Sequence, residues 1–104
     1  MSFTVTHRYG CMDRDPPISD LPRLLDELLD RPEDVEHGAV AVTHESEWSI
    51  SVARGGYVLF EHLENGGERH MLEVQDEDIL RMWQLLAAGE IAELELFPWK
   101  PGYE

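Results

Sequence analysis

The feature that most constrains the fold is a series of alternating segments in the middle of the chain, separated by glycine pairs. In these segments apolar residues recur at every second position, which is the period of a half-buried β-strand. Gly55-Gly56 and Asn65-Gly66-Gly67 lie between them and favour tight hairpin turns, because glycine adopts positive φ at little steric cost. We therefore predict an antiparallel meander with strands over residues 38–44, 47–53, 57–63 and 69–74.

Helices are predicted on either side of this meander. Leucines recur at intervals of three and four over residues 21–29, after the N-cap candidates Ser19 and Asp20. Residues 76–88 repeat this pattern, and Gly89 suits the position that ends a helix. Each helix therefore presents one apolar face to a common core.

The two ends of the chain carry further strand patterns. Residues 1–9 alternate apolar and polar side chains, so a strand is predicted there. Residues 92–97 place Leu94 and Leu96 on one side and glutamates on the other, which predicts a last short strand, with a short helix as the alternative. The predicted order is β-α-β-β-β-β-α-β. It describes one α+β domain over residues 1–104, with a largely antiparallel, five- to six-stranded sheet and two helices packed on one face.

The composition is dominated by carboxylates. The chain has 22 Asp and Glu against 8 Lys and Arg, which gives a formal net charge of −14. Nucleic acids and anionic lipids need positive charge for their sequence-independent attraction to a protein, so direct binding to either is disfavoured. A basic protein partner, by contrast, would be steered toward such a surface.

Signals for export or membrane insertion are not found in the sequence. No basic region leads into an apolar run at the N-terminus, and no 18 apolar residues follow one another. The lone Cys11 excludes an internal disulfide and a CxxC metal pair. We expect a soluble, cytoplasmic protein.

Several histidines fall on the apolar side of their predicted strands. His44, His62 and His70 would meet at one end of the sheet, with His62 opposite His70, if the intervening loop spans residues 64–68. Imidazoles arranged in this way could hold zinc, with water in the remaining position. The alternative interpretation is that they mark the boundary between core and solvent. Because no HExxH or HxH motif supports a metal site, no cofactor is predicted.

The sequence motifs of common enzyme classes are absent. There is no GxSxG nucleophile, and Cys11 lies beside acidic rather than basic residues. The glycine pairs are not followed by a lysine and a helix, as they would be in a phosphate-binding loop. A non-enzymatic protein is therefore predicted.

The remaining candidate is a binding surface made of loop carboxylates and aromatic side chains. Trp and Tyr are enriched among the residues that dominate binding energy, so interface anchors could come from Trp48, Tyr57, Trp99 and Tyr103. For Trp48, as for Trp83, the core is the favoured interpretation, and Trp99 and Tyr103 remain as the predicted anchors. The alternative interpretation of the acidic residues is a solvated face that keeps the protein soluble. The acidic residues predicted to bind are Glu33, Asp34, Glu36, Glu45, Glu47, Glu64 and Glu68.

The second half of the chain resembles a known family. The run YVLFEHLENG, the helix DEDILRMWQLLAAGE and the segment AELELFPW are similar to the C-terminal half of actinobacterial immunity proteins of the Imm1 type. The matching residues are Leu85, Gly89 and Trp99, within residues 57–99. The proline that usually follows the glycine in the family is not present here, since Glu90 comes next. The resemblance implies a strand that carries the tryptophan, and a cytoplasmic protein that blocks a cognate toxin, often a nuclease or nucleic-acid deaminase.

Three hypotheses about function follow. The first is a non-enzymatic acidic binding module, most concretely an immunity-like inhibitor of a basic toxin or nuclease. The second is a metal-binding enzyme or sensor that uses the three predicted histidines. The third is a homo-oligomeric structural component that pairs through an exposed strand edge, at residues 1–9 or 92–97.

Overall fold

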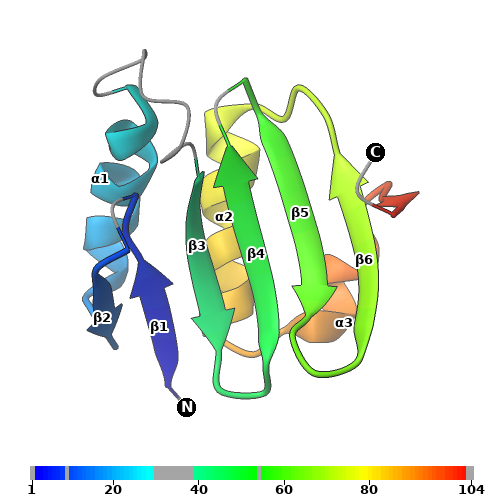
Figure 1. Cartoon of the computed structure of the whole chain (residues 1–104), viewed down its shortest axis with the longest axis horizontal. Helices are drawn as coiled ribbons and strands as arrows, with labels where there is room; N and C mark the ends of the chain where they lie inside the picture. The colour runs from blue at the N-terminus through cyan, green and yellow to red at the C-terminus, as the bar shows by residue number, and fades with distance from the viewer. Residues whose placement is uncertain (1, 9, 30–38, 54, 103–104) are drawn as a thin grey trace.

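The computed structural model describes residues 2–8, 10–29, 39–53 and 55–102 of the chain. Within these residues the chain forms a seven-stranded antiparallel sheet in the order β2-β1-β3-β4-β5-β6-β7, with the helices gathered on one face (Figure 1). The strands are β1 (Phe3–Thr6), β2 (Met12–Arg14), β3 (Ala39–His44), β4 (Trp48–Ala53), β5 (Tyr57–His62), β6 (Gly66–Met71) and β7 (Lys100–Pro101). The helical segments are η1 (Ile18–Asp20), α1 (Leu21–Asp26), η2 (Glu27–Leu29), α2 (Asp76–Ala87) and α3 (Ile91–Leu94).

The α+β class and the predicted meander are confirmed. Strands β3 to β6 follow one another in the chain and are hydrogen-bonded neighbours in the sheet. Val42 of β3 pairs with Ile50 of β4, which in turn pairs with Phe60 of β5, so buried apolar side chains lie in register across the sheet. The period-two pattern that predicted these strands also places their fully buried apolar side chains on the face covered by the helices.

The sheet has more strands than the five to six predicted. The additional ones are β2, which pairs with β1, and β7, which pairs with β6. They contain three and two residues, and the side chains of both strands are exposed. Because neither strand buries an apolar face, neither shows the alternation of apolar and polar residues by which a strand is recognised in a sequence.

The strand predicted over residues 92–97 is wrong, and its alternative, a short helix, is correct. Helix α3 covers Ile91–Leu94 and is followed by a turn, in which Leu96 N donates to Glu93 O at 3.2 Å. A strand here would need an edge to pair with, but the free edge of β6 is occupied by β7. The strand that the Imm1-type resemblance implies at this position is therefore a helix and a turn.

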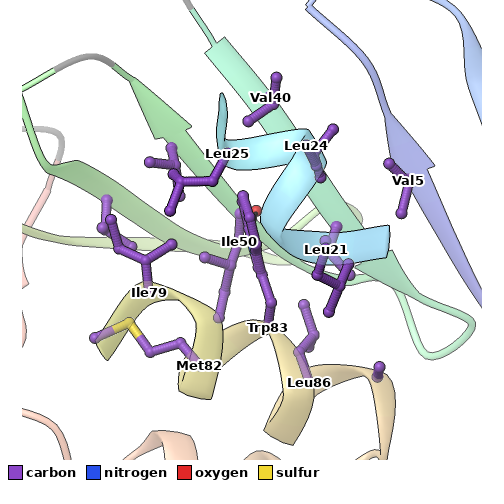
Figure 2. Packing of buried hydrophobic residues seen from close by; sticks show 14 of the residues in the cluster. Val5, Leu21, Leu24, Leu25, Val40, Ile50, Ile79, Met82, Trp83 and Leu86 are labelled. Carbon is purple, nitrogen blue, oxygen red and sulfur yellow. Dashed lines mark hydrogen bonds between the residues drawn. The ribbon is translucent and has the colours of Figure 1, made fainter. Parts of the chain in front are cut away.

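The core lies between the sheet and helices α1 and α2 (Figure 2). Trp83 is confirmed as a core residue: its side chain is fully buried, and its Nε1–H donates to Ile50 O at 3.1 Å, so the indole is buried without an unpaired donor. Each fully buried large apolar side chain contributes about 1.5–3 kcal/mol through removal from water. The helix residues that form this core include Leu21, Leu24 and Leu25 from α1 and Ile79, Met82, Trp83 and Leu86 from α2.

The strand edges proposed for self-association are not edges. β1 lies inside the sheet, between β2 and β3, and residues 92–97 are not a strand. In the described part of the chain the outer strands are the very short β2 and β7, and short edge strands offer little backbone for pairing with another chain. A homo-oligomer would therefore have to form through another surface.

Candidate binding surface

Two turns lie next to each other at one end of the sheet and carry exposed carboxylates. The β3–β4 turn contributes Glu45 and Glu47, and the β5–β6 turn contributes Glu64. Leu63 N donates to Glu47 O at 2.9 Å, so the two turns are joined by a backbone hydrogen bond. We call these three glutamates the acidic end. It lies at the lower end of the sheet in Figure 1, where β3 and β5 terminate.

The backbone of this end is unusual at Glu47. Its φ is +77°, in the left-handed region that L-residues other than glycine, asparagine and aspartate rarely adopt. Placing a glutamate there costs about 1–2 kcal/mol relative to an unstrained conformation. Glu47 therefore does not owe its place in this turn to backbone preference.

Trp48 follows Glu47 directly and lies at the boundary between core and solvent. Its indole stacks on Phe60 with ring centroids 4.8 Å apart and meets the His62 ring edge-on at 5.1 Å. The sequence predicted Trp48 in the core. In the structure Trp48 packs against the core but is only half-buried, and it lies beside the exposed carboxylates. Aromatic side chains are enriched at protein interfaces, and the rim around them is polar.

Trp99, which was predicted as an interface anchor, is half-buried and engaged in packing. Its ring stacks on Phe60 with centroids 5.0 Å apart, and its Nε1–H donates to Leu94 O at 2.7 Å. The indole therefore fixes the segment after α3 against the sheet. A binding role for its exposed part remains a prediction.

Arg69 connects this aromatic group with α3. Its guanidinium lies 4.8 Å from the Phe60 ring centroid and 5.7 Å from that of Trp48, and it forms an ion pair with Glu95. The guanidinium thus lies over two aromatic rings and is paired with one carboxylate.

The predicted meeting of His44, His62 and His70 does not occur. His62 pairs with Gly66 across a short turn, and an irregularity between Phe60 and His62 shifts the register, so that His70 lies opposite Leu59. The observed partner of His70, Leu59, lies an odd number of residues from the predicted partner, His62. A difference of an odd number of residues moves a side chain to the other face of the sheet. The loop that was assumed to span residues 64–68 is shorter than that, which is the physical reason for the error.

Each of these histidines has a local hydrogen bond instead. His44 Nδ1 lies 2.8 Å from Ser46 Oγ, His62 Nδ1 accepts from Asn65 N at 3.1 Å, and His70 Nδ1–H donates to Gly102 O at 2.8 Å. Among the residues that the structure describes, no group of three or more His, Cys, Asp or Glu side chains is arranged to hold a metal ion.

A different histidine, His7, lies at the centre of an ionic cluster that the sequence did not reveal. Its Nδ1–H donates to Glu27 Oε2 and its Nε2–H to Asp13 Oδ2, each at 2.6 Å. A neutral imidazole has one N–H, so donation to both carboxylates requires the protonated ring. The hydrogen bonds that His7 donates to Glu27 and Asp13 accordingly raise the pKa of its ring above the ordinary value of 6.5.

This cluster joins three elements that are separate in the sequence. It links β1, the strand β2 and the helical segment η2, and Glu27 also accepts from Arg8 N at 3.0 Å and from Arg8 Nη1, through its backbone oxygen, at 2.9 Å. The side chains line a cavity of about 210 Å³. In the sequence, His7 has the same parity as the buried residues Phe3 and Val5, which was the one indication that its side chain could be enclosed. Its partner Asp13 belongs to strand β2, which was not predicted.

The other predicted binding residues are distributed as follows. Glu68 lies in β6 with the parity of His70, and its backbone oxygen accepts from Gly102 N at 2.8 Å. Its side-chain carboxylate lies beside Gly66, where β6 begins at the β5–β6 turn. The predictions for Glu33, Asp34, Glu36 and Tyr103 fall outside the described residues.

Comparisons of the chain with models of protein families, with curated proteins and with solved structures give no match. In the part of the chain that the structure describes, no helix has the length and apolar character needed to cross a membrane.

Proposed function

We propose that this chain is a non-enzymatic acidic binding module, an immunity-like inhibitor that covers the cationic site of a basic toxin or nuclease. The observation that carries the proposal is the acidic end, where Glu45, Glu47 and Glu64 project from two joined turns. The turns themselves, residues 45–47 and 63–65, contain no Lys or Arg. A surface of this kind resembles the phosphate backbone in charge, so it competes with nucleic acid for a cationic site.

The strained backbone at Glu47 and the position of Trp48 support the same proposal. Glu47 keeps a left-handed backbone in spite of its cost, as Asp15 and Glu73 do elsewhere, and its side chain is exposed at the turn. Trp48 places a rigid aromatic surface beside the carboxylates, so a partner would gain apolar contact next to the charged contact. In this proposal the chain acts in the cytoplasm of the cell that makes the toxin.

Capture followed by an inhibition assay tests the proposal. The immobilised protein is exposed to native lysate at low salt, eluted with salt, and the eluted proteins are identified and purified. We expect a basic protein whose toxic or nuclease activity is lost when this chain is added in equal amount. A captured partner that keeps its full activity, or one that is itself acidic, would contradict the proposed inhibition.

A further inference from the structure

A shallow apolar groove lies between α2 and the turn that follows α3. Its volume is about 230 Å³, and its lining residues are Arg81, Leu85, Glu93, Leu96, Phe97 and Pro98. Leu96 is 78% exposed, the largest exposed fraction among the large apolar side chains of the described residues. A concave apolar surface of this kind is where a protein partner inserts a side chain.

The exposure of Leu96 is imposed by the surrounding structure. Leu94, two residues earlier, is fully buried, and its backbone oxygen accepts from Phe97 N at 3.3 Å and from the Trp99 indole at 2.7 Å. Glu95 is held by its ion pair with Arg69. Leu96 is therefore exposed while Leu94 is anchored in the core, and the groove is present in the chain without a partner. A preformed groove avoids the entropy cost of ordering its walls on binding.

The charges around the groove decide what can occupy it. Glu93 is part of its wall, and Glu90 is exposed at the start of α3. A second copy of this chain would bring its own carboxylates against these, and like charges in contact are strongly disfavoured. The acidic residues of segment 76–100 are Asp76, Glu77, Asp78, Glu90, Glu93 and Glu95, against Arg81 and Lys100 as its basic residues.

We propose that this groove binds an apolar side chain from a basic protein segment, with a neighbouring lysine or arginine paired to Glu93. The inference rests on the proposed function, because it names the place where the basic partner gains its apolar contact. Arg81 lies on the α2 wall of the groove and would repel a basic residue there. The basic residues of the partner therefore lie on the α3 side of the inserted apolar side chain.

Peptide probes test the inference without knowledge of the partner. One fluorescein-labelled peptide carries a phenylalanine flanked by lysines, and the other has serine in place of phenylalanine. Fluorescence anisotropy at low salt gives Kd for each peptide with the wild-type chain and with Leu96→Ser, Glu93→Gln and Leu72→Ser. Leu72 is 45% exposed and lies outside the groove, so Leu72→Ser is the matched control.

We expect the phenylalanine peptide to bind the wild-type chain about tenfold more tightly than the serine peptide. Leu96→Ser should abolish this difference, Glu93→Gln should weaken both peptides, and Leu72→Ser should behave as the wild type. Circular dichroism of each variant establishes that it is folded.

The outcomes that overturn the inference differ from those that overturn the proposed function. If the two peptides bind equally and Leu96→Ser changes neither Kd, the groove does not bind the apolar side chain. The acidic surface would then account for the binding by itself, and the proposed function would stand. Failure of both peptides to bind at low salt would contradict the attraction on which the proposed function also rests. A dimer in sedimentation that is lost in Leu96→Ser would assign the groove to a second copy of the chain instead.

Discussion

One imidazole shows how a single residue can hold three elements together. His7 directly follows β1 and donates to Glu27 of η2 and to Asp13 of β2, while β1 itself lies between β2 and β3. The interaction depends on the proton, because only the imidazolium can donate from both nitrogens. The parity of His7 was readable from the sequence, but its partners were not, since they lie six and twenty residues away in elements of different type.

The pH dependence of stability tests this cluster. The folded-state pKa of His7 is raised above 6.5, mainly by Glu27 and then by Asp13, so the cluster stabilises the fold fully below pH 6.5 and less as pH rises through the folded-state pKa. We expect wild-type protein to exceed His7→Gln in free energy of unfolding by about 1 kcal/mol in mild acid, and the difference to shrink toward alkaline pH. Urea unfolding at a series of pH values measures it. A difference that grows with pH would contradict the charged state of His7.

Glu47 allows binding and folding to be separated at one residue. Glycine adopts positive φ without steric cost, so Glu47→Gly should leave the free energy of unfolding unchanged or raise it by about 1 kcal/mol. The same change removes a carboxylate from the acidic end and should weaken partner binding. Thermal unfolding and affinity measured on the same variant check both effects. A clear loss of stability would show that the glutamate side chain is needed for the fold.

At the scale of elements, what could be predicted is what buries an apolar face. Strands β3 to β5 and helix α2 each bury several apolar side chains, and each was predicted close to its observed bounds. Strands β2 and β7 bury none, and α3 contains four residues, too few for a helical period to be distinguished from an alternation. The register of β6 against β5 depends on an irregularity at His62 that leaves no mark in the hydrophobic pattern.

Two leucines distinguish helix α3 from the strand that was predicted. In a strand, Leu94 and Leu96 would share one face and similar burial, whereas in the structure Leu94 is fully buried and Leu96 is 78% exposed. We expect Leu94→Ala to lower the free energy of unfolding by about 2–5 kcal/mol and Leu96→Ala to change it by less than about 0.5 kcal/mol. Denaturant unfolding of the two variants provides the comparison, with each serving as the control for the other. Equal losses would contradict the helix.

At the scale of the whole molecule, the charge was known from composition, but its arrangement required the fold. From the net charge of −14 we expect weak attraction to polyanions. That Glu45, Glu47 and Glu64 lie at one end follows from the pairing of β3 with β4 and of β5 with β6, which the predicted meander already contained, whereas the hydrogen bond that joins the two turns is seen only in the structure. Asp76, Glu77 and Asp78 lie at the start of α2, at the opposite end of the sheet. The two groups can therefore be changed separately.

The association rate of the captured basic partner, measured against ionic strength, tests most directly whether the acidic end steers binding. Charged surfaces that attract each other associate faster at low salt, and screening removes the effect as the Debye length falls to about 10 Å at 0.1 M salt. We expect a steep fall in rate with salt for the wild-type chain. The slope should be much shallower for Glu45→Gln/Glu47→Gln/Glu64→Gln, and nearly wild-type for the matched triple Asp76→Asn/Glu77→Gln/Asp78→Asn. A rate that does not depend on salt, or equal effects of the two triple variants, would contradict the account.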